Sequence, residues 1–299
     1  MASLQVSLLL SSHQLNYMLM KDKYSRDSVI RANVELHTAA ADVYAETEPH
    51  YRPESIDRVT GIIRSLQETT TGQSLLDIGC GRGFIIDIAK SYFKTIRGID
   101  VTPAMLEKVN LQSNTSDIKV YECSSDDIRF NNDSFDACTA FAVLHHLHEI
   151  APTLKEVHRV LKHGGVFYSD VDPNYYFWEA ISQLPGEADY SDIVRREIDQ
   201  ILHKDDEIQA KFGIDKETFQ AAEHLKHVSG GFKEENLVSE FKLAGFSKVE
   251  IRSEWMLGEA GIIHGKETAR VAEQFRHYMR SLLPLSRHLF KYVSVLAVK

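Results

Sequence analysis

Apolar residues recur every three or four positions in the first seventy residues of the chain, as in amphipathic helices. This spacing runs through residues 26–44 and 54–67, and prolines at positions 49 and 53 separate the two stretches. We predict helices over both stretches. We expect residues 1–70 to form a helical cap that leads into the core and belongs to the substrate region.

From residue 74 onward, short apolar runs alternate with helical patterns. Seven runs have the length and composition of strands, at 74–78, 95–99, 118–121, 134–141, 165–171, 248–251 and 292–298. Helical patterns lie between them, at 84–93, 103–111, 152–161, 234–243 and 266–283. Alternation of this kind indicates a parallel sheet with right-handed crossovers. The predicted fold class is therefore α/β, with a doubly wound, mostly parallel, seven-stranded Rossmann-like sheet.

The alternation is interrupted after the fifth strand, over residues 174–231. This stretch carries twelve acidic and six basic residues and holds most of the net negative charge. We predict two or three helices with a solvated outer face, forming a lid over the substrate. The expected organisation is a cap at 1–70, a core at 71–173, a helical insertion at 174–231 and completion of the sheet at 232–299.

Composition narrows the classes of partner. The chain has 299 residues, of which 43% are hydrophobic, and a net charge of -9, which opposes binding to nucleic acid or to an anionic membrane. The apolar run Leu8–Leu10 is too short to span a bilayer and has no basic residue before Lys21. Cys80, Cys123 and Cys138 show no C-x-x-C spacing. We expect a cytoplasmic protein without a metal site.

The segment from Leu75 to Phe84, LLDIGCGRGF, reads as a buried strand that runs into a glycine turn and then a helix. Gly79, Gly81 and Gly83 remove the side chain at alternate positions, so the backbone can adopt positive φ and approach a ligand closely. A dinucleotide fingerprint requires a third small residue where this chain has Phe84. The loop therefore favours a nucleoside ligand without a pyrophosphate.

Two carboxylates follow the ends of predicted strands. Asp77 lies two residues before the first glycine, and Asp100 ends the second strand, 23 residues later. Ligands bind at this carboxyl edge of open α/β sheets, and a carboxylate at position 100 can accept from both ribose hydroxyls. The alternative for both residues is a helix cap or a turn.

The pattern Asp-x-Gly-x-Gly-x-Gly, together with Asp100, resembles motif I of the class I S-adenosylmethionine-dependent methyltransferases. The resemblance covers residues 70–172 closely and 232–299 more loosely. It implies S-adenosylmethionine as cofactor and S-adenosylhomocysteine as product, with direct in-line methyl transfer to an oxygen, nitrogen or carbon of a small molecule. It also implies that Asp77, the three glycines, Asp100 and Val101 hold the cofactor.

The same resemblance assigns further cofactor contacts. The segment after the third strand resembles the part of the family that grips adenine, which places Ser125 or Asp126 against the base, although the family often has an acidic residue where this chain has Ser124. An Asp pair can also be a solvated turn. The carbonyl of Ala142 would accept from the amino group of the cofactor. Tyr44 would lie near its methionine moiety, unless it is a packing aromatic.

Candidate catalytic groups are histidines, because an imidazole near the methyl group can remove a proton from a hydroxyl or an amine. His145 and His146 follow the fourth strand, and His50 follows the N-terminal helix. The alternative is that His146 only ties two loops together.

Three competing functions share parts of this pattern. A nicotinamide-dependent oxidoreductase would use the same sheet and the ribose carboxylate, but Phe84 argues against it. A non-catalytic S-adenosylmethionine-binding scaffold would keep the pocket. An aminopropyl transferase would need acidic residues that bind an amine, and none can be located. The identity of the methyl acceptor and the choice between monomer and homodimer remain open.

Overall fold

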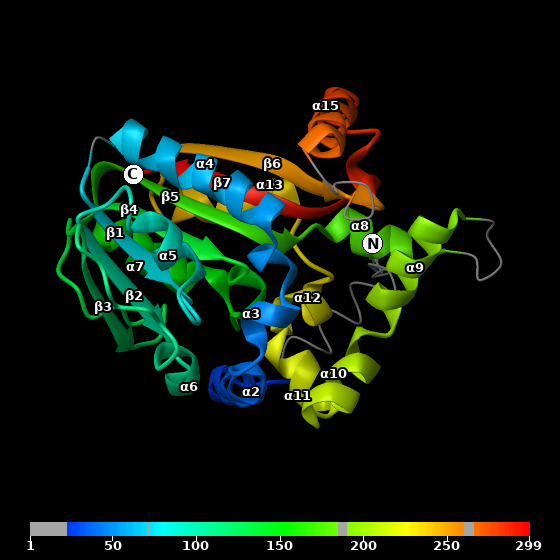
Figure 1. Ribbon diagram of the computed structural model, residues 1–299, viewed down its shortest axis with the longest axis horizontal. Coiled ribbons are helices and arrows are strands. Elements are labelled where there is room, and N and C mark those ends of the chain that lie inside the picture. The colour runs from blue at the N-terminus through cyan, green and yellow to red at the C-terminus, as the bar shows by residue number, and fades with distance from the viewer. Residues whose placement is uncertain (1–22, 71, 185–189, 260–265) are drawn as a thin grey trace, which may run out of the picture.

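A seven-stranded sheet forms the centre of the computed structural model, which describes residues 23–70, 72–184, 190–259 and 266–299 (Figure 1). Its strands are β1 (Ser74–Ile78), β2 (Thr95–Asp100), β3 (Asp117–Glu122), β4 (Phe135–Phe141), β5 (Leu161–Pro173), β6 (Lys248–Met256) and β7 (Phe290–Val298). Their order in the sheet is β3-β2-β1-β4-β5-β7-β6.

The first five strands are parallel, and β7 runs antiparallel between β5 and β6. The predicted fold class is confirmed. Because β1 lies between β2 and β4, the chain winds away from it in both directions. Such a switch point leaves a crevice at the carboxyl ends of the strands, where ligands of α/β sheets bind.

Helices cover both faces of the sheet. On one face lie α4 (Pro53–Thr70) and α5 (Phe84–Ala89), and on the other lie α7 (Ile150–Val160) and α13 (Glu234–Leu243). Strand β1 supplies both layers, because side chains alternate along a strand. Leu75 packs against α4 and α5, and its neighbour Leu76 packs on the opposite face; neither is exposed.

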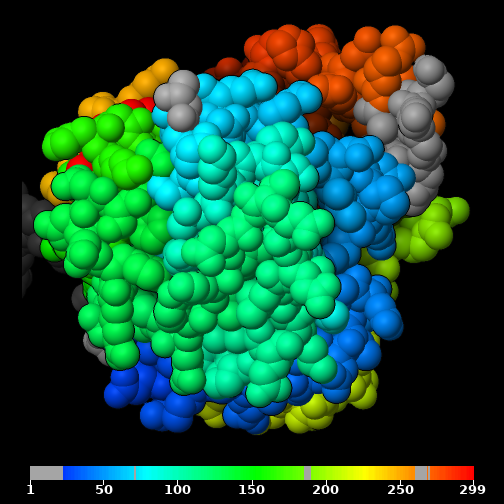
Figure 2. Space-filling model, turned by 60° about the vertical axis from the view of Figure 1, so that its left-hand side comes forward, coloured from blue at the N-terminus to red at the C-terminus, as the bar shows by residue number. Residues whose placement is uncertain are grey.

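The N-terminal cap consists of α2 (Arg26–Ala40), α3 (Tyr44–Thr47), a short 3-10 turn and α4. The helix expected over residues 26–44 is thus divided, because the helical hydrogen bonding of α2 ends at Ala40 and the chain turns before Tyr44. Helix α2 lies beside the insertion, where Val29 and Leu36 share an apolar cluster with Phe219. Figure 2 shows these blue and yellow-green segments meeting along one edge.

In its described residues, 174–184 and 190–231, the insertion after β5 holds five helices, where two or three were expected. They are α8 (Tyr175–Ser182), α9 (Asp192–Leu202), α10 (Lys204–Phe212), α11 (Lys216–Ala222) and α12 (His224–Ser229). The extra breaks have local causes. Gly213 is left-handed and ends α10, and the Asp215 side chain accepts the N–H of Thr218 to begin α11.

Several boundaries also differ from expectation. Helix α7 runs from Ile150 to Val160, whereas a helix over 152–161 was expected. Leu161 already pairs with Phe135, and Gly164 lies at a left-handed position within β5 with its N–H bonded to the carbonyl of Lys299. Helix α6 (Pro103–Leu106) is shorter than expected. Of the helices in the described ranges, none is long and apolar enough to cross a membrane.

Candidate active site

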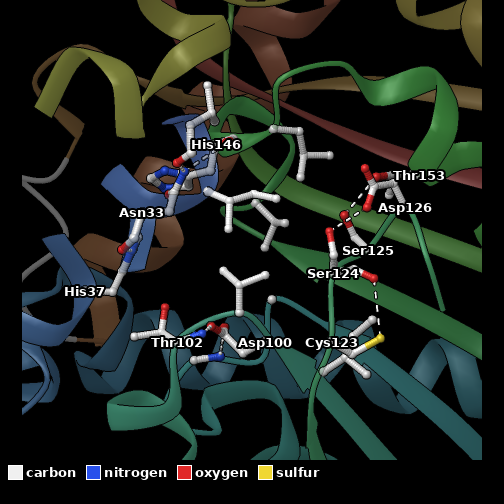
Figure 3. Close-up of a pocket in the computed structure, with 18 of the residues that line it drawn as sticks. Asn33, His37, Asp100, Thr102, Cys123, Ser124, Ser125, Asp126, His146 and Thr153 are labelled. Carbon is white, nitrogen blue, oxygen red and sulfur yellow. Dashed lines mark hydrogen bonds between the residues drawn. The ribbon is translucent and has the colours of Figure 1, made fainter. Parts of the chain in front are cut away.

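A cleft with a cavity volume of about 200 Å³ opens at the carboxyl ends of β1, β2 and β4 and is lined on one side by α2 (Figure 3). Most of the residues expected to contact the cofactor line it. They are Tyr44, Gly79, Gly81, Asp100, Val101, Ser125, Asp126 and Ala142. Sequence positions that lie up to 98 residues apart therefore meet in one cavity, as the switch-point argument predicts.

Asp100 ties the glycine turn to the end of β2. One carboxylate oxygen accepts the N–H of Gly81 at 2.8 Å, and the other accepts the N–H of Thr102 at 2.8 Å. Each oxygen of a carboxylate has a second lone pair, so both can still accept a ligand hydroxyl. Asp100 thus caps a turn and faces the cleft at once.

The three glycines of the turn have positive φ angles of 61° at Gly79, 51° at Gly81 and 93° at Gly83, but they serve different needs. A Cβ at Gly79 would lie 2.5 Å from Val143, and one at Gly83 would lie 3.0 Å from Val109. A Cβ at Gly81 would meet nothing within 4 Å, because this position faces the open cleft. The absence of a side chain at Gly79 and Gly83 therefore permits close packing, and at Gly81 it leaves the wall of the cleft bare.

Asp77 lies beneath the turn and is 1% exposed. Its Oδ1 accepts a hydrogen bond from the Thr139 hydroxyl at 2.8 Å, whereas its Oδ2 has no hydrogen-bond partner among the described residues. Burial raises the pKa of Asp77 to about 8. Asp77 borders a smaller hollow next to the cleft rather than the cleft itself. A buried carboxyl oxygen without a partner suits a donor supplied by a ligand.

Ala142 directly follows β4 and has a left-handed conformation, with φ at 57°. Its N–H donates to the carbonyl oxygen of Asp170 at 2.8 Å, which holds the strained residue against β5. Strain of this kind at a cavity wall is typical of ligand-contacting backbone.

His146 lines the cleft, and its tautomer follows from its neighbours. Its Nδ1 lies 2.9 Å from the carbonyl oxygen of Ala222, which can only accept, so Nδ1 carries the proton and Nε2 keeps a lone pair. Burial lowers the pKa of His146 well below 6.5, which leaves the ring neutral near pH 7.

His145 lies behind the cleft wall. Its backbone N–H and its Nδ1 both bond to Oδ1 of Asp172, at 3.2 and 3.0 Å. Burial lowers the pKa of His145 to about 4. The two neighbouring histidines are thus held by different elements, His145 by β5 and His146 by α11.

The expected adenine end holds an ion pair that connects the cap to the sheet. Arg26 of α2 binds both carboxylate oxygens of Asp126, at 2.5 and 2.6 Å, and these hydrogen bonds lower the pKa of Asp126. Ser124 donates to the same carboxylate at 2.5 Å. Ser125 is buried, with its hydroxyl 2.8 Å from that of Thr153.

Helix α2 is tied to the site at two further points. The Asn33 side chain donates to the carbonyl oxygens of His146 at 3.1 Å and Ala222 at 3.2 Å. Arg82 of the glycine turn donates to the carbonyl oxygen of Ala41 at 3.2 Å. The cap, the insertion and the glycine turn are therefore joined to one another by hydrogen bonds.

His50 lies in an aromatic group beside the glycine turn. Its ring centre is 4.8 Å from that of Phe84 and 5.6 Å from that of Phe141, and burial lowers its pKa to about 4. It lines the smaller hollow with Asp77, whereas Tyr44 borders both cavities. The described ranges contain no group of three or more His, Cys, Asp or Glu side chains that could hold a metal ion.

Sequence reasoning missed Arg26 and Asp172. A signal existed for Asp172, because it follows the fifth strand and the end of that strand lies beside the end of the fourth. No local pattern marks Arg26, whose partner Asp126 is 100 residues away.

Comparison with known proteins identifies the domain. Residues 76–169 match the family described as a methyltransferase domain. Residues 76–169 therefore form a methyltransferase domain. The chain is 32% identical over 108 residues to a ubiquinone biosynthesis O-methyltransferase of Paracidovorax citrulli, covering 34% of this chain and 45% of that protein. A protein of the same name from Pseudomonas syringae is 26% identical over 152 residues, covering 49% and 66%.

The chain thus spans about half to two thirds of the length of these curated relatives. Solved methyltransferases share the fold. Phosphoethanolamine N-methyltransferase 2 of Haemonchus contortus superposes with a TM-score of 0.55 at 16% identity, covering 93% of this chain and 61% of that one. An S-adenosylmethionine-dependent methyltransferase of Archaeoglobus fulgidus gives 0.51 at 16% identity, covering 82% and 95%. The resemblance inferred from the glycine turn is confirmed.

Proposed function

We propose that the methyltransferase domain binds S-adenosylmethionine and transfers its methyl group to an oxygen, nitrogen or carbon nucleophile of a small molecule. The observation that carries this proposal is the pairing of Asp100 with Gly81 at the switch point of the sheet. A carboxylate and a bare backbone there suit a ribose and the nucleoside chain next to it. The relatives support it, since two are named O-methyltransferases and the Haemonchus contortus enzyme was solved with S-adenosylhomocysteine.

The residues present fit this cofactor. Asp100 would accept from the ribose hydroxyls, and the open face of Gly81 would lie against the nucleoside. Ser125 and Asp126, with Val101, would border the base. A pyrophosphate would require a positive or amide-rich cradle, and Phe84 opens the helix where such a fingerprint has a small residue.

The amino-acid end of the cofactor would lie toward Asp77 and Ala142. The unpaired Oδ2 of Asp77 would provide an acceptor once the positively charged amino group of the cofactor displaces the proton that burial favours, and the left-handed Ala142 would provide a carbonyl at the end of β4. Tyr44 borders both cavities and would cover the methionine moiety.

Bound S-adenosylmethionine supplies a methyl group on a sulfonium, which is already a strong electrophile. The task of the protein is then to align the nucleophile and to exclude water. Helix α2 covers the cleft, and its bonds from Asn33 and Arg26 hold it there. His146 would accept the proton of a hydroxyl or an amine at Nε2, because Nδ1 is committed to the carbonyl of Ala222.

The acceptor would be chosen by the cap and the insertion. The Ala222 carbonyl at the end of α11 orients the proposed base, and Asn33 of α2 donates to the same carbonyl. A change of acceptor therefore requires changes in these two segments rather than in the glycine turn. We expect a small molecule because the cleft is closed over by helices.

Calorimetric titration with S-adenosylhomocysteine and, separately, with NAD tests the proposal. We expect binding of S-adenosylhomocysteine and none of NAD. Binding of NAD alone would replace the proposal with an oxidoreductase. Incubation with S-adenosylmethionine and a panel of phenols, amines and carbon acids follows, with S-adenosylhomocysteine release corrected for hydrolysis. Release with no acceptor in the panel, despite tight cofactor binding, would favour a non-catalytic scaffold.

A further inference from the structure

Asn33, His37 and His146 form a wall at the end of the cleft away from Ser125 and Asp126 (Figure 3). We call this group the imidazole wall. Asn33 and His37 lie about one helical turn apart on α2. The ring centres of His37 and His146 are 5.2 Å apart, so one small molecule can contact both rings. Because the proposed cofactor contacts lie elsewhere in the cleft, this wall is available to the methyl acceptor.

The side-chain amide of Asn33 has a fixed orientation. Its Nδ2 lies between 2.9 and 3.2 Å from three backbone carbonyl oxygens, those of Val29, His146 and Ala222. A carbonyl oxygen can only accept a hydrogen bond, so the amide atom that faces all three is the nitrogen. Asn33 is 7% exposed, and its Oδ1 has no hydrogen-bond partner among the described residues. A buried amide oxygen of this kind suits a donor that a ligand supplies.

The two imidazole rings also offer hydrogen-bond acceptors. Nδ1 of His37 lies 2.9 Å from the carbonyl oxygen of Asn33, and Nδ1 of His146 lies 2.9 Å from that of Ala222. In the neutral ring each Nδ1 therefore carries the proton, and each Nε2 keeps a lone pair. Within the described part of the chain, neither Nε2 atom forms a hydrogen bond. The imidazole wall thus presents three hydrogen-bond acceptors to a ligand.

The charged side chains that line the cleft are engaged with other groups. Arg26 pairs with Asp126, Asp100 binds the glycine turn, and Glu149 also has a partner. A carboxylate or a phosphate on the ligand would need a cation at the imidazole wall. The cation that lines the cleft, Arg26, lies beside Asp126 at the expected adenine end.

Two further carboxyl groups lie near the imidazole wall but do not line the cleft. Glu223 interacts electrostatically with His146, and Glu48 does so with His37. Glu223 already forms an ion pair with Lys226. An ammonium group at the wall would therefore lack a carboxylate in contact with it, so the wall favours an uncharged ligand that donates hydrogen bonds.

We propose that the imidazole wall binds the methyl acceptor through two neighbouring hydroxyl groups, so that the acceptor is a small, uncharged diol with an apolar body. One hydroxyl donates to Nε2 of His146, the proposed base, and its neighbour donates to Nε2 of His37. The side chains of Val29 and Leu147, which line the same cleft, suit the apolar body. This inference rests on the proposed function, because the diol is the methyl acceptor of the same site. His37 is then the residue that distinguishes a diol from a compound with one hydroxyl.

Ligand-observed NMR of the full chain with saturating S-adenosylhomocysteine tests the wall, at about pH 7.5, above the ordinary pKa of an imidazole. The probes are benzene-1,2-diol, phenol, benzoate and benzylamine. We expect the diol to bind at least about fivefold more tightly than phenol, because it forms one more hydrogen bond. Benzoate and benzylamine should bind more weakly than phenol, because a charge at the wall has no counter-ion.

Variants of His37 test whether its Nε2 causes the preference. His37→Phe keeps an aromatic ring beside His146 and Tyr44 but removes the nitrogen. It should bind the diol and phenol with equal affinity, to within about twofold, and S-adenosylhomocysteine as the wild type does. His37→Gln retains an oxygen that can accept, and it should restore part of the preference. His163→Phe is the matched control, because His163 is exposed outside the cleft and its loss should leave the preference intact. Circular dichroism establishes that the variants are folded.

The outcomes separate this inference from the proposed function. A wild-type chain that does not bind S-adenosylhomocysteine would overturn the proposed function and the inference with it. Binding of S-adenosylhomocysteine without a preference for the diol over phenol would overturn the inference alone. So would tighter binding of benzoate or benzylamine than of the diol, or a folded His37→Phe variant that keeps the full preference.

Discussion

Asp100 accepts the backbone N–H of Gly81 across 2.8 Å, although 19 residues separate them in the chain. This hydrogen bond joins the turn after β1 to the end of β2, so it fixes the conformation of the cleft wall before a ligand binds. Preorganisation of this kind reduces the entropic cost of binding.

Replacing Asp100 should therefore act on cofactor binding. In Asp100→Ala the N–H groups of Gly81 and Thr102 lose their acceptor and the ribose loses its own. We expect the affinity for S-adenosylhomocysteine to fall at least tenfold, about 1.4 kcal/mol, in calorimetry. Asp87→Ala removes a carboxylate that pairs with Lys90 on α5, and it should bind as the wild type does. Equal affinity in both variants would show that the ribose lies elsewhere.

A methyl group at Gly81 should block the cleft. Gly81→Ala adds a Cβ where the structure has open space and also imposes strain at a φ of 51°. Gly164 provides the control, since it too has positive φ, at 74°, with nothing within 4 Å, but it lies in β5 outside the cleft. We expect both alanine variants to lose about 1 kcal/mol of stability, with only Gly81→Ala losing tenfold or more in cofactor affinity. Similar cofactor affinities in the two variants would show that Gly81 is needed only for the conformation of the turn.

If His146 is the general base, kcat should depend on pH in a defined way and should fall when His146 is replaced. Burial keeps His146 neutral below pH 6.5, so kcat should persist as the pH falls past that value. His146→Ala should lower kcat by about 100-fold with little change in cofactor affinity. His163→Ala, at an exposed position, is the control. Preserved turnover in His146→Ala would make this residue a structural tie between α11 and the end of β4.

Buried Asp77 should make stability depend on pH. Burial raises the pKa of Asp77 to about 8, whereas in the unfolded chain it titrates near its ordinary 3.8. The folded protein holds a proton that the unfolded chain releases, so this contribution is full below pH 3.8 and is lost as the pH rises through 8. Between pH 5 and 8, urea denaturation should show the wild type losing at least about 1 kcal/mol relative to Asp77→Asn. If the free energy of unfolding depends on pH in the same way in the wild type and in Asp77→Asn, the raised pKa of Asp77 is contradicted.

The Arg26 to Asp126 pair predicts how firmly the cap is held. Arg26→Ala should speed hydrogen exchange in α2 and weaken cofactor binding several-fold, because α2 covers the cleft. Lys108→Ala breaks a different link to the cap, with the exposed Asp42, and should have a smaller effect. Unchanged exchange in Arg26→Ala would show that apolar contacts alone hold α2.

The strands and the glycine turn could be predicted from the sequence because both depend on residues that are close together in the chain. Leu75, Leu76 and Ile78 of β1 are apolar because both faces of this strand are covered, and the turn at positions 79, 81 and 83 needs glycine because its φ angles are positive. The doubly wound order then places Asp77 and Asp100 at one edge of the sheet. For these residues, pattern and structure agree.

Contacts between distant segments could not be predicted in this way. Asn33 bonds to Ala222 across 189 residues, and Arg26 to Asp126 across 100. Such pairs depend on how the cap and the insertion pack on the sheet, which hydrophobic periodicity does not encode. For the same reason, His145 and His146 were both expected from the sequence to be catalytic candidates. In the structure, His145 bonds to Asp172, whereas His146 bonds to the carbonyl oxygen of Ala222.

Among the strands that the structure describes, β6 pairs with β7 alone and so joins the sheet through it. During synthesis, residues 248–256 leave the ribosome before the strand that must seat them, so β6 waits without a partner and the edge of β5 stays uncovered. The strand that is made last, β7, must therefore pair with β5 before β6 can join the sheet. Pairing of this long-range kind is slow and leaves unpaired backbone open to aggregation.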